Sequence, residues 1–130
     1  MNYYFNTTIN DLGFEEAIDR VTAALKEEGF GILTEIDVKE TFKKKLDVDF
    51  KKYKILGACN PNFAYEALKA EDKIGVFLPC NVVVEEQENG AIEISIVDPV
   101  ASMTSVENTQ LGELASEVRE KLISVVENLN

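Results

Sequence analysis

The sequence predicts an α+β fold in which a sheet packs its apolar face on the first and the last helix. Three observations predict it. Apolar residues recur every three or four positions near both ends of the chain, several segments between them have strand patterns, and an Asn-Gly turn in the second half indicates a hairpin. Residues 1–130 are expected to form a single domain, because no linker, repeat or low-complexity tract interrupts this plan and the length is typical of one domain.

The first two predicted elements are a strand and a helix. Residues 3–8 alternate aromatic and polar side chains as a strand does, and residues 10–13 then begin a helix. Its apolar stripe consists of Phe14, Ala17, Ile18, Val21, Ala24 and Leu25. Gly29 is expected to end this helix, since glycine is favoured just after a helix C-terminus.

The next segments alternate between strand and helix patterns. Residues 31–36 are predicted to form a strand, residues 38–46 a short lysine-rich helix, and residues 53–58 a further strand. Asn60-Pro61 then marks a helix start, because asparagine is a good N-cap and proline suits the first helical position. The buried side of this helix is predicted to consist of Phe63, Ala64, Ala67 and Leu68.

The second half of the chain has two more strand patterns and a long helix. Residues 74–86 are strand-like but interrupted at Pro79, which has no N–H for a ladder and so implies a bulge or a sheet edge. Residues 88–90, Glu-Asn-Gly, are expected to turn the chain into a strand over residues 91–97, with Asn-Gly supplying positive φ values. From about Asn108, a long amphipathic helix is predicted by the stripe Leu111, Leu114, Val118, Leu122, Val125 and Leu129.

The charge of the chain argues against nucleic acid and membrane partners. Thirteen basic and twenty-four acidic residues give a net charge of −11, which repels phosphate backbones and anionic lipid surfaces. Residues 39–54 are the exception, with seven lysines against three acidic residues and a local charge of +4. Such a patch can hold an anionic ligand or an acidic partner, although a charge run on a short helix is more often a solvated face.

The absence of histidine restricts the possible enzyme chemistry. It removes the commonest general base, the commonest zinc ligand and every Ser-His or Cys-His pair. The sequence also contains no HExxH, GxxxxGKS/T or GxGxxG motif, so no metal or nucleotide cofactor is indicated. Only carboxylate, lysine or thiol chemistry is left, and no catalytic residue is assigned.

A cytoplasmic location is expected. The first six residues have no basic region followed by an apolar core, so they do not read as a secretory signal, and no apolar run reaches membrane-spanning length. Two cysteines in a domain large enough to form a core argue against a secreted disulfide framework. Both thiols are therefore expected to be reduced.

The two cysteines are the sharpest chemical feature of the sequence. Each follows a short apolar run and directly precedes an asparagine, which gives Cys59-Asn60 and Cys80-Asn81. The segment between them is predicted to contain one turn, one short helix and one strand, so the two sulfur atoms could meet in space. Cys59, Asn60, Cys80 and Asn81 are therefore the candidate residues of a ligand or thiol site, and no metal site is assigned.

An ordered series of motifs resembles a known family. Residues 53–61 (YKILGACNP), Ile74-Gly75, residues 78–84 (LPCNVVV), Asp98-Pro99 and Met103 strongly resemble the family called Domain of Unknown Function 302, over essentially the whole chain. The resemblance implies a TATA-binding-protein-like fold, with a curved antiparallel sheet on helices, often seen as a homodimer, and it implies no established activity. The fold name does not imply DNA binding, because the acidic charge opposes it.

A homodimer is accordingly expected. Besides the resemblance, the interruption at Pro79 is expected to leave a sheet edge or a bulged surface that a second copy would cover.

Cys59 allows two interpretations. If Asn60 caps the following helix, free N–H groups and the helix dipole would lower the pKa of the Cys59 thiol, and the lysines of residues 51–54 could add to this effect. Alternatively, Cys59 packs as a small apolar residue. Cys80 lies in a more apolar segment, where burial would raise its pKa, so Cys59 is expected to be the more reactive thiol.

The asparagines and Met103 have simpler structural interpretations. Helix capping explains Asn60 fully, and stabilising a bulge beside Pro79 explains Asn81 nearly as well. Asp98-Pro99 most simply ends a strand. Met103 is expected to fill the core, although together with two thiols it would suit a soft metal such as Cu(I).

Three function classes stay open. The first is a non-enzymatic binding or interaction domain, for a small molecule or a protein, with a small pocket near Cys59 and Cys80. The second is a thiol-based redox or sulfur-transfer protein that uses an exposed Cys59 of low pKa. The third is a soft-metal protein of the Cu(I) type, which requires three soft atoms to converge. The first class is favoured, with no cofactor.

Overall fold

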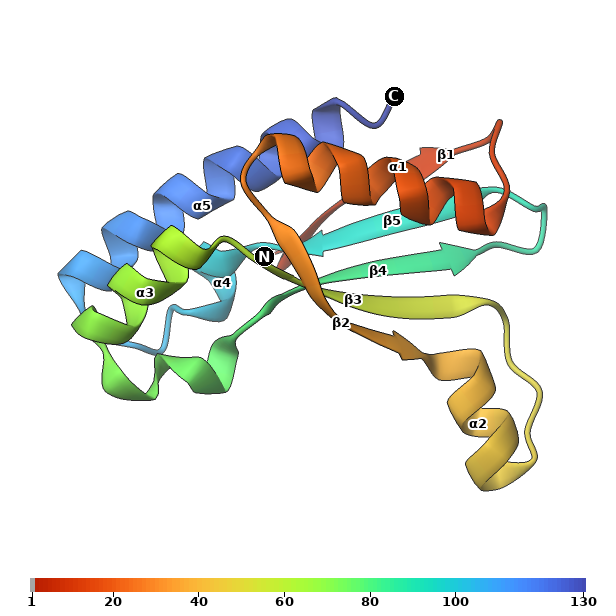
Figure 1. Ribbon diagram of the computed structural model, residues 1–130, viewed down its shortest axis with the longest axis horizontal. Helices are drawn as coiled ribbons and strands as arrows, with labels where there is room; N and C mark the ends of the chain where they lie inside the picture. Colours follow the sequence, from red (N-terminus) through yellow and green to blue (C-terminus); the bar gives the residue numbers. More distant parts are fainter. Residues whose placement is uncertain (1) are drawn as a thin grey trace.

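A five-stranded antiparallel sheet forms the centre of the fold. The computed structural model describes residues 2–130 and places the strands in the order β1-β5-β4-β3-β2 (Figure 1). The strands are β1 (Tyr4–Ile9), β2 (Gly31–Asp37), β3 (Tyr53–Cys59), β4 (Cys80–Glu86) and β5 (Ile92–Val97). Every pair of neighbours is antiparallel. The predicted α+β class is confirmed.

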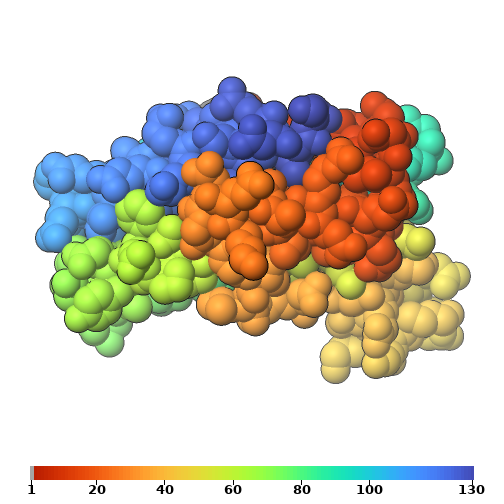
Figure 2. Space-filling view, turned by 45° about the horizontal axis from the view of Figure 1, so that its top comes forward, coloured from red at the N-terminus to blue at the C-terminus, as the bar shows by residue number. Residues whose placement is uncertain are grey.

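Helices cover one face of this sheet. α1 (Phe14–Glu27) and α5 (Thr109–Glu127) lie side by side on it, as the ribbon and the space-filling view both show (Figure 1 and Figure 2). Alternate side chains of the inner strands β4 and β5 are fully buried, namely Val82, Val84, Ile92, Ile94 and Ile96. Burying each such side chain stabilises a fold by about 1.5–3 kcal/mol. The predicted packing of the sheet on the first and last helices is therefore confirmed.

The lysine-rich helix α2 (Val38–Leu46) has the predicted bounds and contains no buried residue. It projects from the end of the molecule opposite to α3 (Pro61–Ala70) (Figure 1). The Lys43 ammonium lies 3.0 Å from the Asp47 carboxylate, and further ion pairs of this kind occur along the segment. The segment is thus an exposed surface whose charges are partly paired locally.

The strand predicted over residues 74–86 is wrong in its first half. Asp72–Phe77 form a 3-10 helix, η1, and β4 begins only at Cys80. Ile74 is buried against side chains of α3 and α5, so helix packing rather than sheet pairing takes up the apolar residues of this segment. Pro79 directly precedes a strand that lies between β3 and β5, so it marks neither a bulge nor a sheet edge.

The sheet does contain a bulge, but it lies in β2. Ile32 pairs with Ala58 and Thr34 pairs with Gly57, which leaves Leu33 as the extra residue. β2 and β1 are the two edges of the sheet. The argument for a homodimer therefore loses its support at Pro79, and the homodimer itself stays a prediction.

The turn between β4 and β5 differs from the predicted one. Gly90 has a positive φ of +86°, but Asn89 does not and uses its side chain instead, with Oδ1 accepting a hydrogen bond from the Ala91 N–H at 3.0 Å. The Gly90 N–H also donates to the Gln87 carbonyl at 2.9 Å. The turn therefore needs one glycine preceded by an Asx turn, rather than two residues with positive φ.

The C-terminal half ends in a short helix and a long one. α4 (Pro99–Ser102) has no counterpart among the predicted elements, whereas α5 begins where predicted, because Asn108 Oδ1 accepts a hydrogen bond from the Leu111 N–H at 3.1 Å. Among the helices of residues 2–130, none combines the length and the apolar character that a membrane span requires.

Candidate functional site

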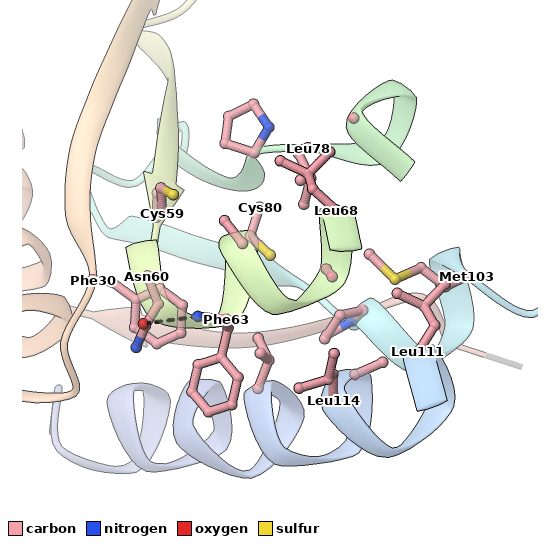
Figure 3. Close-up of a pocket in the computed structure, with 18 of the residues that line it drawn as sticks. Phe30, Cys59, Asn60, Phe63, Leu68, Leu78, Cys80, Met103, Leu111 and Leu114 are labelled. Carbon is pink, nitrogen blue, oxygen red and sulfur yellow. Dashed lines mark hydrogen bonds between the residues drawn. The ribbon is translucent and has the colours of Figure 1, made fainter. Parts of the chain in front are cut away.

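A pocket lies at one end of the sheet, where β3 and β4 meet α3, α4 and α5 (Figure 3). Its volume of about 370 Å³ falls within the range of roughly 300–1,000 Å³ that is usual for small-molecule sites. Its lining residues are Phe30, Leu33, Ala58, Cys59, Asn60, Phe63, Ala64, Ala67, Leu68, Gly75, Leu78, Pro79, Cys80, Pro99, Met103, Leu111, Leu114, Ala115 and Val118. Apart from one amide and two thiols, every side chain in this lining is apolar.

Asn60 forms one corner of the pocket and fixes the start of α3. Its Oδ1 accepts a hydrogen bond from the Phe63 N–H at 3.4 Å, and Pro61 occupies the first helical position, as the sequence predicts. Its Nδ2 donates to the Glu28 carbonyl at 3.5 Å. The Asn60 side chain therefore ties the start of α3 to the end of α1 and is engaged at both of its polar atoms.

Both cysteines lie at the strand ends that border this pocket. Cys80, the first residue of β4, pairs with Ala58 of β3, and Cys59 follows Ala58 as the last residue of β3. Both thiols are free and partly buried, and both line the pocket. Met103 lies on the opposite side of the pocket from Cys59 (Figure 3). The structure thus brings Cys59, Asn60 and Cys80 together, but the three sulfur atoms do not gather at one point.

Burial controls the acidity of the two thiols. It raises the pKa of Cys80 to about 11, with the nearby Cys59 thiol adding to the shift, and it also raises the pKa of Cys59. The low pKa predicted for Cys59 is therefore wrong. Few free donors are left at the start of α3 to stabilise a thiolate, because Pro61 has no N–H and the Phe63 N–H is already bonded.

The lysines of residues 51–54 do not assist Cys59 either. They lie at the other end of β3 or before it, and even Lys54 is about 17 Å away along extended chain. Lys51 is paired with the Glu85 carboxylate at 2.6 Å. Their positive charges therefore do not act on the Cys59 thiol.

Asn81 does not belong to this pocket. Successive residues of a strand point to opposite faces, so Asn81 lies on the face of the sheet away from Cys80. There it lines a separate cleft with Tyr53 and Glu85. Its predicted role beside a bulge at Pro79 is also wrong, since the bulge lies in β2.

The sequence and the fold both match one family. A family model described as Domain of unknown function DUF302 matches residues 5–129. This chain belongs to the DUF302 family. A crystal structure of the uncharacterized conserved protein DUF302 from Bacillus stearothermophilus is similar to it, with 29% sequence identity, coverage of 100% of each chain and a TM-score of 0.91. No curated protein matches the chain. The family description and the structure name no activity.

Sequence reasoning missed several pocket residues of this DUF302 chain. Leu33 reaches the pocket because of the bulge in β2, and Leu111 because α5 passes beside α3. Neither position is encoded in local sequence. α4, by contrast, had a recognisable signal, because Asp98-Pro99 repeats the N-cap and proline pattern of Asn60-Pro61.

Asp98 holds α4 against α5 beside the pocket of the DUF302 fold. It is buried, with 7% of its surface exposed. Its Oδ1 accepts a hydrogen bond from the Val100 N–H at 3.0 Å, and its Oδ2 accepts one from the Arg119 Nε–H at 3.3 Å. Asp98, which was expected to end a strand, therefore also caps the helix that carries the pocket residue Pro99.

Both thiols are expected to react slowly with iodoacetamide in the folded protein. For Cys80, a rise in pKa from 9.0 to about 11 leaves about a hundredfold less thiolate at neutral pH, and the thiolate is the reactive form. Mass spectrometry after timed alkylation at pH 8 should show Cys59 modified before Cys80, and both more slowly than in urea-unfolded protein. The Cys59→Ser variant shows which part of the alkylation time course belongs to Cys59. Faster alkylation of Cys59 in the folded than in the unfolded chain would contradict this prediction.

Proposed function

We propose that this DUF302 domain is a non-enzymatic binding domain that holds a small apolar molecule in the pocket beside Cys59 and Cys80. One observation carries the proposal: the pocket has 19 lining residues and none of them has a charged side chain. Removal of apolar surface from water contributes about 25 cal/mol per Å², which must exceed the entropic cost of binding. The lining offers no group of suitable pKa for general acid–base work.

The walls and the rim of the pocket differ in a way that supports a binding role. Ala58, Ala67 and Leu111 are buried, with 1%, 7% and 2% of their surfaces exposed, so this part of the wall is formed without a ligand. Leu33 and Leu68 are 68% and 44% exposed. Exposed apolar side chains at the edge of a pocket are typical of ligand-binding grooves, in which a bound molecule covers them.

The two alternative functions have less support from the geometry. A redox or sulfur-transfer role needs a readily formed thiolate at Cys59, and burial raises the pKa of that thiol. A Cu(I)-type site needs three soft atoms around one point, and Met103 lies across the pocket from Cys59 (Figure 3).

We also infer that the domain acts in the cytoplasm and as a homodimer. The two unbridged cysteines, close to each other along neighbouring strands, are typical of a reducing compartment. The homodimer rests on the family resemblance alone.

Filling the pocket tests the proposed function. The neutral dye Nile red becomes fluorescent in apolar surroundings, and we expect the protein to bind it in a saturable manner. Ala64 lines the pocket on α3, so Ala64→Leu adds carbon atoms inside the pocket and should weaken binding at least about tenfold.

Ala70 provides the matched control on the same helix. It does not line the pocket, and Ala70→Leu should leave dye binding unchanged. A cooperative unfolding transition of each variant, measured by circular dichroism, is the check that both variants are folded. No saturable binding to the wild-type protein, or equal affinities of Ala64→Leu and wild type, would remove the proposal.

A further inference from the structure

Three helices begin beside the pocket, and each is closed by its own N-cap. The caps are Asn60 for α3, Asp98 for α4 and Asn108 for α5. Free N–H groups at helix N-termini bind phosphates and carboxylates, so three such ends around one cavity would ordinarily favour an anionic ligand.

Side-chain oxygens already occupy N–H groups at all three ends. The bonds run from Phe63 N–H to Asn60 Oδ1 at 3.4 Å, from Val100 N–H to Asp98 Oδ1 at 3.0 Å, and from Leu111 N–H to Asn108 Oδ1 at 3.1 Å. Pro61 and Pro99, at the first positions of α3 and α4, have no N–H to offer. Fewer free N–H groups are therefore left at these helix ends for an anion, and at α4 the cap is itself a carboxylate.

The lining has no charge of its own that could pair with an ionic ligand. Its polar side chains are Asn60, Cys59 and Cys80. The amide is engaged by Phe63 and Glu28, and burial holds both thiols in their neutral form. An ion placed in this pocket would lose its hydration without gaining an opposite charge or strong hydrogen bonds, which is unfavourable.

We propose that the ligand is uncharged, namely a neutral molecule with an aliphatic chain that the pocket recognises by apolar contact. This inference rests on the proposed function and narrows it to one ligand class. The α5 wall runs from Leu111 to Val118, which is about 10 Å along the helix axis at 1.5 Å per residue. A medium-length chain fits a wall of this length.

Three ligands of equal chain length and different charge test the inference. 1-Octanol, octanoate and octylammonium are each used to displace Nile red from the wild-type protein at pH 7 and constant ionic strength. We expect 1-octanol to displace the dye at a concentration at least about tenfold lower than either ion. The same titration with Ala64→Leu, at dye concentrations scaled to its weaker binding, should show the displacement by 1-octanol weakened as well.

The outcomes separate this inference from the proposed function. Suppose that the dye binds in a saturable manner but octanoate or octylammonium displaces it at less than about ten times the concentration of 1-octanol. That result would contradict the proposal of a neutral ligand, and the proposed binding pocket would be retained. Tighter displacement by octanoate would show that the capped helix ends still accept an anion, and it would also overturn the inference. Absence of dye binding would instead count against the proposed function itself.

Discussion

Replacing Gly57 with alanine is expected to lower the free energy of unfolding by about 3 kcal/mol. The added Cβ would lie 2.7 Å from Cγ of Pro79 and closer still to Oγ1 of Thr34. Neither neighbour moves easily, because the proline ring is closed and β-branching restricts the threonine side chain. Gly57 also sits in a central position of β3, paired on both sides, so the backbone has little freedom to shift.

Gly112→Ala is the matched control for this substitution. Gly112 lies in α5 with no other atom within 4 Å of an added Cβ, and alanine favours a helix over glycine by about 0.5–1 kcal/mol. Urea unfolding followed by circular dichroism should therefore move in opposite directions for the two variants. A loss below about 1 kcal/mol for Gly57→Ala would contradict the prediction, since ordinary surface substitutions reach only about 0.5 kcal/mol.

Replacing Asp98 with alanine is also expected to lower the free energy of unfolding by about 3 kcal/mol. The variant loses a helix N-cap, which contributes about 1 kcal/mol, and a hydrogen bond between charged groups, which contributes about 1.5–3 kcal/mol. Arg119 loses its buried partner but is itself partly exposed, with 38% of its side chain accessible, and it can regain water. Loss of the Asp98 cap should also weaken Nile red binding, because α4 carries Pro99, which lines the pocket.

Two further variants locate the cause of the Asp98 effect. Asp98→Asn keeps an oxygen for the Val100 N–H and removes the charge, so it should fall between wild type and Asp98→Ala. Glu120→Ala removes an exposed carboxylate 3.9 Å from Arg119 and should change stability by less than about 0.5 kcal/mol. Equal unfolding midpoints for Asp98→Ala and Glu120→Ala would show that the buried pair contributes nothing.

Helices and most strands could be predicted because their signals are local. The stripe from Phe14 to Leu25, the Asn60-Pro61 start and the alternation in residues 91–97 each fix an element without reference to distant residues. η1 could not be separated from a strand in this way. Its short apolar run is ambiguous by periodicity alone, and only the packing of Ile74 on α3 and α5 decides it.

Part of the candidate site could be predicted from the sequence. Cys59, Asn60 and Cys80 line one pocket, as the short connection predicted between the two cysteines suggested, but Asn81 was grouped with them because it follows Cys80. Strand alternation would have separated Cys80 from Asn81, since Val82 and Val84 share the face of Cys80. The thiol acidity was misjudged because burial depends on α3 and α5 closing over the strand ends, which no local pattern records.

The edge strand β1 is separated from its partner β5 by a much longer stretch of chain than β4 is. Ile9 pairs with Ile92 across the intervening residues 10–91, whereas Glu86 pairs with Ile92 across a short turn. Closing the longer loop costs roughly 2.5 kcal/mol more conformational entropy, at about 0.6 kcal/mol for each doubling of loop length. No turn geometry offsets that difference for β1. Its place at the edge of the sheet depends instead on pairing with β5 along its whole length and on the fully buried Ile9, so β1 is the strand that chain connectivity positions least.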